Sequence, residues 1–284
     1  MKLTKKLKKE IRGQARNQAK IKRKIDKLIE AGIDEYREWT ANQFDKSQKP
    51  ITIIAEGDSW FNYLLAGKDV IDKLERLMSI KINNLASPGD EAAEMLTGEQ
   101  KERLERELKR GPANKKRKKY DFFLFSGGGN DLVGKKTFYL WFHDYKKGMQ
   151  PKDILNTQAI GRAFGMLEVN YKVLFGIRDN YSPETVILLN AYDFAIPDGR
   201  GVCFKGPWLQ PGLKHRKVPV GMRTKVVELF LREYETFISN LAKKNNNIIV
   251  VPTQGTLTKN DWANELHPTN PGFNEIAKVF EQSI

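Results

Sequence analysis

Five short runs of apolar and β-branched residues, separated by longer segments with helical periodicity, constrain the fold of this chain most strongly. The runs span Ile51–Ala55, Ile80–Leu85, Tyr120–Phe125, Thr185–Ala191 and Ile248–Val251. Almost unbroken apolar strands indicate a sheet that is buried on both faces, and alternation with helices indicates parallel pairing. The sequence therefore predicts one α/β domain over residues 48–284, with a mainly parallel five-stranded sheet between two helical layers.

The segments between these runs repeat apolar residues every three or four positions, which is typical of amphipathic helices. The expected helices are Val70–Met78, Glu91–Leu108, Ile154–Arg178, Val220–Lys244 and Pro271–Phe280. One connection, Ala191–Pro219, is unusually long and is interrupted by Pro and Gly. A connection of this length is usually functional, so we expect either a lid or pocket wall, or a surface loop fixed by Trp208.

The net charge of +14 is concentrated in two segments. Residues 1–24 hold eleven basic residues and one acid, and Lys109–Lys119 holds seven basic residues, so the rest of the chain has a net charge of −3. Apolar residues recur at helical spacing through the first segment, which predicts a basic amphipathic arm over residues 1–47. Either residues 1–30 and 109–119 make weak contacts with a polyanion or an anionic membrane, or the arm packs on the domain.

Composition excludes several classes of protein. Hydrophobic residues make up 40% of the chain, which excludes wholesale disorder, and the single cysteine, Cys203, excludes an intrachain disulfide and a thiolate-rich metal site. The chain lacks zinc-finger spacing and aromatic residues among its basic ones, so no obligate nucleic-acid partner is expected. It also lacks the apolar run of a signal peptide or membrane span, so we expect a cytoplasmic protein. The sequence leaves the oligomeric state open.

Polar residues that can support catalysis follow the predicted strands. Ser59 follows the first strand, Gly89 the second, Asn130 the third and His267 the last. Because the carboxyl ends of parallel strands meet at one edge of a sheet, where ligands bind, we expect these residues to lie close together. A serine nucleophile needs a base, usually a histidine, and His267 alone among the three histidines follows a strand at this edge.

These blocks resemble those of the SGNH/GDSL hydrolases: Gly-Asp-Ser at 57–59, Gly at 89, Gly-Gly-Asn-Asp at 128–131 and His-Pro at 267–268, in that order. The resemblance extends from Ile51 to the C-terminal helix. It implies a flavodoxin-like three-layer α/β/α fold and hydrolysis of small-molecule, lipid or sugar esters through a serine acyl-enzyme, without metal or cofactor. It also implies Ser59 as nucleophile, His267 as general base, and an oxyanion hole of the Ser59 N–H, the Gly89 N–H and the Asn130 amide.

One position departs from the family pattern. The family usually places an Asp three residues before the histidine, where this chain has Asn264. Asp261 lies six residues before His267 and Glu265 two before it, and either could reach the ring if the loop bends. An Asn can hold an imidazole in the required tautomer but cannot offset the charge of an imidazolium. We therefore expect Asn264, or in second place Asp261, to orient His267, with a Ser–His dyad as the third arrangement.

Two other functions are compatible with the same residues. One is transfer of the acyl group to an acceptor other than water. The other is a catalytically degenerate SGNH-fold protein that binds nucleic acid or anionic membrane through its basic arm.

Overall fold

The structure is a computed structural model that describes residues 27, 29–33, 35, 51–63, 69–113, 118–133, 137–202 and 206–284. Most of the predicted arm over 1–47, part of the predicted basic loop 109–119, and Cys203 lie outside the described residues. Within the arm, residues 29–33 are helical, and Ile29 and Ile33 are buried in the core of the domain.

The central sheet has five strands, and every pair of neighbours is parallel. In chain order they are β1 (Ile53–Gly57), β2 (Asn83–Asn84), β3 (Phe122–Ser126), β4 (Val186–Asn190) and β5 (Ile248–Val251). Their order across the sheet is β2-β1-β3-β4-β5, which is the flavodoxin-like arrangement. The predicted fold class is therefore confirmed.

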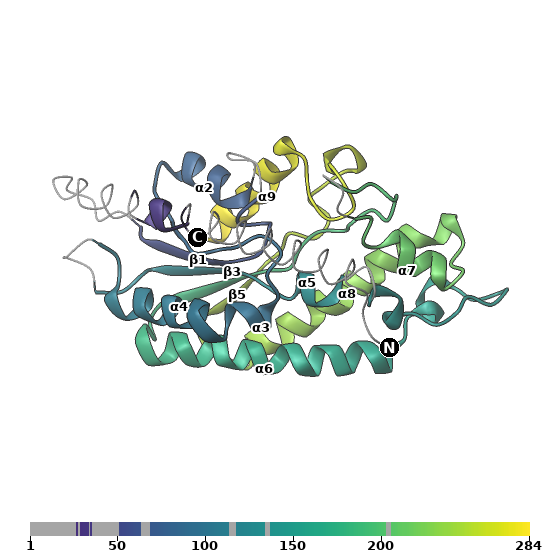
Figure 1. The fold of residues 1–284 in the computed structure, drawn as a ribbon, viewed down its shortest axis with the longest axis horizontal. Coiled ribbons are helices and arrows are strands. Elements are labelled where there is room, and N and C mark those ends of the chain that lie inside the picture. Colours follow the sequence, from purple (N-terminus) through teal and green to yellow (C-terminus); the bar gives the residue numbers. More distant parts are fainter. Residues whose placement is uncertain are drawn as a thin grey trace, which may run out of the picture.

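Helices cover both faces of this sheet, as Figure 1 shows. On one face α2 (Val70–Met78) packs against α9 (Asn270–Ser283), and on the other lie α4 (Gly98–Arg110), α6 (Thr157–Tyr181) and α8 (Val220–Lys243). Shorter elements lie in the connections: α3 (Ala92–Met95), α5 (Gly129–Leu132), α7 (Gln210–His215) and the 3₁₀ turns η1 (Phe138–Trp141), η2 (Pro151–Ile154) and η3 (Lys259–Asp261).

Two sequence predictions of element boundaries were wrong. The predicted strand over 80–85 is only Asn83–Asn84, an edge strand, although the Leu85 N–H still donates to Ala55 O and the Ser87 N–H to Gly57 O. These bonds lead the chain toward the end of β1. The predicted helix over 91–108 is divided into α3 and α4, because Thr97 is extended and Gly98 has a φ of +54°.

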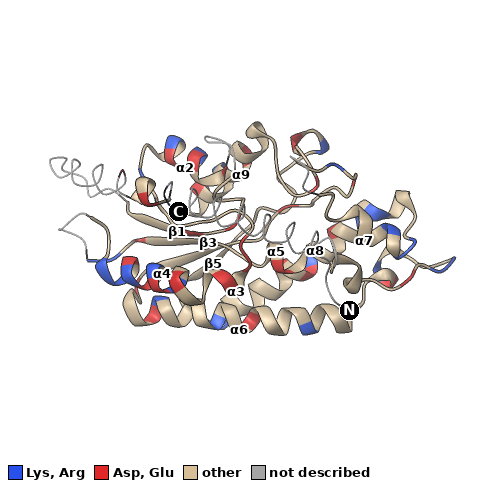
Figure 2. Cartoon of the chain, viewed as in Figure 1, with Lys and Arg blue, Asp and Glu red and all other residues tan. Residues whose placement is uncertain are grey.

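Charges are mixed on the described part of the domain. Along α4 acidic and basic positions alternate, and Lys109 and Arg110 occupy its last turn (Figure 2). Cations at that end favour the helix, because the last carbonyl groups carry partial negative charge. Within the described residues, no helix combines the length and the hydropathy that crossing a membrane requires.

Close packing where β1 meets β3 sets the start of the loop that carries Ser59. Gly57 pairs in register with Ser126, and a Cβ atom at Gly57 would lie 2.8 Å from Ser126 O. A larger residue would separate the strands at this point. The Asp58 N–H then donates to Ser126 O at 2.9 Å, which extends the pairing by one residue before the chain turns.

Candidate functional site

Ser59 lies in a tight turn directly after β1. The N–H groups of Phe61 and Asn62 both donate to Asp58 O, at 3.1 and 3.0 Å, and close the turn around the serine. Phe61 is fully buried and Trp60 is 4% exposed, so both anchor the turn in the core. The serine itself is half-buried.

A buried polar network fixes this turn to the neighbouring strands. The Asp58 carboxylate accepts hydrogen bonds from the Tyr192 hydroxyl at 2.6 Å, from the Ser126 hydroxyl at 3.0 Å and from the Trp60 N–H at 3.0 Å. Burial raises the pKa of Asp58 to about 6, and these hydrogen bonds hold it from rising further. Asn190 at the end of β4 donates to the Ser126 hydroxyl at 3.0 Å. The network therefore connects the ends of β1, β3 and β4.

The structure brings Ser59 and His267 together from opposite ends of the domain sequence. Ser59 Oγ lies 2.7 Å from His267 Nε2. His267 is 7% exposed and lies in the loop between β5 and α9. Its ring lies against Tyr63, with 4.8 Å between ring centroids, and against Trp208, at 5.9 Å.

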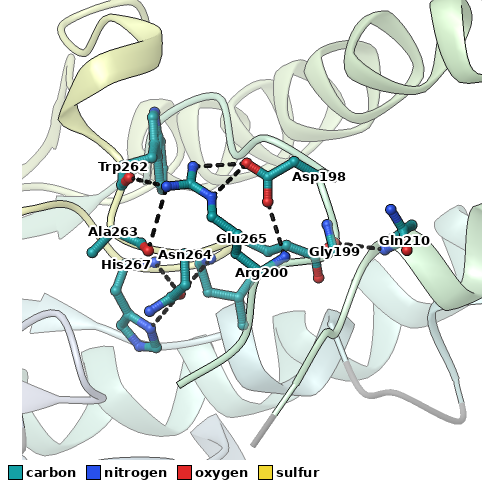
Figure 3. Close-up of polar contacts among 10 residues, drawn as sticks. Asp198, Gly199, Arg200, Gln210, Trp262, Ala263, Asn264, Glu265 and His267 are labelled. Carbon is teal, nitrogen blue, oxygen red and sulfur yellow. Dashed lines mark hydrogen bonds and ion pairs between the residues drawn. The ribbon is translucent and has the colours of Figure 1, made fainter. Parts of the chain in front are cut away.

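Asn264 determines which nitrogen of His267 carries the proton (Figure 3). Asn264 Oδ1 accepts from the N–H groups of Leu266 and His267, both at 3.0 Å, so the side-chain atom at this place must be the oxygen. The same oxygen lies 3.0 Å from His267 Nδ1. Because a carbonyl oxygen can only accept, Nδ1 must donate, and Nε2 faces Ser59 with its lone pair.

Burial without a nearby carboxylate keeps the imidazole neutral. Loss of hydration lowers the pKa of His267 to about 4, because the charged form is the one that burial disfavours. The ring is therefore in its basic form at neutral pH.

The two carboxylates near His267 in the sequence have other partners. Asp261 accepts from the Thr258 N–H and hydroxyl, at 2.8 and 2.6 Å, at the start of η3. Glu265 is fully buried and points to the other side of the loop (Figure 3). Its two oxygens accept four backbone N–H groups, those of Gly199, Trp208, Leu209 and Gln210, at 2.5 to 3.0 Å.

The sequence suggested Glu265 only as an acid that could reach His267, and the structure gives it this other role. Its carboxylate fixes Gly199 and residues 208–210 against the loop that carries His267, although these segments are more than 50 residues apart. Arg200 adds a second connection, since its guanidinium donates to Trp262 O at 2.7 Å and pairs with Asp198. No local motif marks an acid that binds distant backbone N–H groups, so the sequence offered no signal for it.

Asn130 lies on α5, at the same carboxyl edge of the sheet as Ser59. Its Nδ2 donates to Asp90 O at 2.9 Å, which places the amide beside the turn that contains Gly89. Gly89 has a φ of +90°, a conformation that favours glycine. Ser59, Asn130 and His267 all line one cavity, whereas Gly89 is not among its lining residues.

The cavity beside Ser59 has a volume of about 50 Å³ and is lined mainly by apolar side chains. The predicted pocket wall contributes to it, since Tyr192, Asp193, Ala195 and Leu209 belong to the 191–219 connection. Among the described residues, no group of three or more His, Cys, Asp or Glu side chains has an arrangement that could hold a metal ion.

Comparisons with known proteins identify the fold. No protein-family profile and no curated protein sequence matches the chain. Among solved structures, an extracellular lipase from Streptomyces rimosus is 13% identical with a TM-score of 0.50, over 82% of this chain and 100% of the lipase. Phospholipase A1 from Streptomyces albidoflavus NA297 is 12% identical with the same TM-score, over 83% of this chain and 100% of that one.

A member of the lipolytic G-D-S-L family from Veillonella parvula is 15% identical, with a TM-score of 0.47, over 82% of this chain and 97% of its own. At these identities the likeness concerns the fold. The chain has the fold of the SGNH/GDSL hydrolases.

Proposed function

We propose that this protein is a serine hydrolase that cleaves carboxylic esters through an acyl-enzyme. The observation that carries the proposal is the 2.7 Å contact between Ser59 Oγ and His267 Nε2, with Asn264 Oδ1 holding the proton on Nδ1. A serine hydroxyl becomes a competent nucleophile when a neutral imidazole nitrogen accepts its proton. The pairing of hydroxyl, lone pair and fixed tautomer meets that requirement.

In the first half of the reaction, Ser59 Oγ attacks the ester carbonyl carbon while its proton passes to His267 Nε2. The carbonyl oxygen becomes an oxyanion, for which we propose the Ser59 N–H, the Gly89 N–H and the Asn130 amide as donors. The Asn130 amide has two N–H bonds, so one can remain on Asp90 O while the other reaches the oxyanion. The imidazolium then protonates the departing alcohol, which leaves an acyl group on Ser59.

In the second half, a water molecule attacks the acyl carbon and gives its proton to His267 Nε2. Collapse of the second oxyanion returns that proton to Ser59 and releases the carboxylic acid. An acceptor alcohol in place of water would give acyl transfer by the same steps. No step requires a metal or a cofactor.

The amide of Asn264 has a specific consequence for this cycle. It orients the imidazole as an Asp would, but it brings no negative charge to the imidazolium that forms in each half-reaction. We therefore expect slower turnover than with a carboxylate at this place, and activity that persists to lower pH. Activity should fall only as the pH approaches about 4, where His267 becomes protonated.

The test is covalent labelling of Ser59 together with ester turnover. Paraoxon, a small phosphorylating agent, should modify Ser59, as located by peptide mass spectrometry, and p-nitrophenyl acetate should be hydrolysed. Ser59→Ala should lose both signals and should lower turnover by at least about 10⁴-fold. Ser283→Ala, at the far end of α9, is the matched control and should retain both.

Absence of labelling and of turnover in correctly folded protein would contradict the proposal. It would favour instead a degenerate SGNH-fold protein that binds polyanions or anionic membranes through residues 1–47. Binding to heparin or to phosphatidylserine vesicles, measured with and without residues 1–24, distinguishes that function, since this deletion removes eleven basic residues and keeps the buried Ile29 and Ile33.

A further inference from the structure

The cavity beside Ser59 presents hydrocarbon to whatever enters it. Its walls contain Leu132, Phe138, Leu209, Val227, Phe230, Leu231 and Tyr234, all buried, from α5, η1, the 191–219 connection and α8. Such a surface favours an alkyl group over a polar one.

The polar groups on these walls are already occupied. The Tyr192 hydroxyl donates to Asp58, and the Tyr234 hydroxyl donates to Gly127 O at 2.8 Å. The Asp193 carboxylate accepts from the N–H groups of Phe194, Gly255 and Leu257, at 2.6 to 2.7 Å. The tyrosine rings therefore face the cavity without a free hydroxyl, and the carboxylate is satisfied by the backbone.

A cluster of three aromatic rings supports one wall of the cavity. Phe138 and Phe230 pack edge to face with 5.6 Å between their centroids, and Phe142 packs behind both, at 5.0 and 5.9 Å. Phe138 and Phe230 line the cavity, whereas Phe142 is fully buried and does not. Because a close-packed aromatic wall resists displacement, it limits the length of a bound chain.

The volume of the cavity limits the length of the alkyl group that it can hold. A single water needs about 10–15 Å³ of a volume measured in this way, and an apolar cavity of about 150 Å³ in a protein interior holds benzene. At about 50 Å³, the cavity has room for an alkyl tail of only a few carbons. Ser59, Asn130 and His267 lie on its margin, so such a tail would extend inward from a carbonyl group placed at the serine.

We propose that this cavity is the acyl pocket and that it restricts the substrate to esters of short acids, of about two to four carbons. The inference rests on the proposed function, because it assumes that Ser59 is acylated. It assigns Phe230 and Val227 on α8 as residues that determine acyl length. The alcohol portion of the substrate lies outside the pocket and is not restricted by it.

The experiment measures kcat/KM of the full chain for p-nitrophenyl acetate, butyrate, hexanoate and octanoate, below the concentration at which the longer esters form micelles. We expect acetate or butyrate to be the best substrate and octanoate to be at least about tenfold poorer, because a hydrophobic pocket discriminates by about tenfold or more per misplaced methylene. Octanoate turned over as efficiently as butyrate would overturn the inference.

Variants then test which residues limit the length of the acyl group. Phe230→Leu shortens the wall and should raise the octanoate-to-butyrate ratio about tenfold. Val227→Ala, which removes less volume and has a smaller effect on folding, should raise it in the same direction by a smaller factor. Phe142→Leu is the matched control, since it loosens the same ring cluster from outside the cavity and should leave the ratio within about twofold of wild type. An equal shift in Phe142→Leu would contradict the assignment.

Paraoxon labelling separates this inference from the function on which it rests. If Ser59 is labelled and long acyl esters are preferred, only the short-acyl inference fails. If correctly folded protein shows neither labelling nor hydrolysis of any ester in the series, the proposed function fails and the acyl pocket fails with it.

Discussion

The two sides of the site are built in different ways. The serine side, residues 57–61 with 126–130, continues directly from β1 and β3, and the bond from Asp58 N to Ser126 O extends the sheet into it. The histidine side, residues 258–268 with 199–202 and 206–210, lies beyond the sheet and is fixed by the side chains of Asn264 and Glu265.

Because of this difference, changes to the polar networks of the two sides should have different effects on stability and on the position of the base. On the serine side the Asp58 network crosses three buried strand ends, so its loss would weaken the core itself. On the histidine side two adjacent side chains organise the loops, one by orienting the imidazole and the other by binding four N–H groups. Because loops open locally at lower free energy than core strands, changes there should displace the base while the sheet stays folded.

After the loss of Ser59 itself, the largest effect is expected at Asn130. Asn130→Ala removes a proposed oxyanion donor from the serine side and should lower kcat by about 10²–10³-fold, the usual loss for one such donor. The half-buried amide has one hydrogen bond to Asp90 O, so thermal unfolding should change little. Steady-state kinetics and a melting curve measure the two outcomes, and an unchanged kcat would exclude Asn130 from the oxyanion hole.

Replacing one buried carboxylate by an amide on each side of the site compares the two sides directly. Glu265→Gln turns an NH₂ group toward backbone N–H donors, which releases Gly199 and residues 208–210 and should lower kcat/KM about ten- to a hundredfold. Asp58→Asn makes the same change in the serine side, where it should lower the free energy of unfolding by about 2–3 kcal/mol.

Urea unfolding and kinetics on both variants check this comparison. We expect the larger loss of stability in Asp58→Asn and a smaller one in Glu265→Gln. The reverse order would show that the histidine side is part of the stable core.

The pH profile gives the next effect in size. In the wild type the base is protonated, and activity is lost, as the pH falls through about 4. Asn264→Asp places a carboxylate against Nδ1, which stabilises the imidazolium and raises the pKa of His267 by at least about one unit. Activity of this variant should therefore be lost at a higher pH on acidification. The pH dependence of kcat/KM measures the shift, and an unmoved acid limb would mean that residue 264 does not contact the functional base.

The smallest effect is expected at Asp261. Its carboxylate binds Thr258, and the contact to His267 Nδ1 comes from Asn264. Asp261→Ala should keep kcat within about twofold of wild type, whereas Asn264→Ala should lower it further because the imidazole loses its fixed tautomer. If both variants keep wild-type rates, neither residue orients His267.

Local pattern was enough to predict the sheet and the strand ends. The apolar runs at β1, β3, β4 and β5 each correspond to an observed parallel strand, because a strand buried on both faces needs a continuous apolar stretch. The short edge strand β2 and the break before Gly98 were missed, since an edge pairs on one side only and a single Gly interrupts a helix without changing its periodicity.

The types of residue at the strand ends were also predictable from the sequence, but their contacts with one another were not. The sequence placed Ser59, Asn130 and His267 at one edge, and the structure brings Ser59 and His267 to 2.7 Å. The sequence left open whether Asn264 or Asp261 faces the imidazole, because a side chain either three or six residues before His267 in a loop can reach its ring. The path of the backbone between η3 and α9 decides this, and no periodicity encodes that path.

What the sequence by itself determined is the parallel α/β architecture and the set of side chains at its carboxyl edge, because both follow from local spacing and strand direction. What only the tertiary structure decided is the tautomer of His267, the role of Glu265 and the volume of the cavity. The tautomer depends on the path of the backbone between η3 and α9. The role of Glu265 and the cavity volume depend on contacts between segments more than 50 residues apart and on how side chains fill the space between them. Distances of a few tenths of an ångström matter there, and the order of residues along the chain does not specify them.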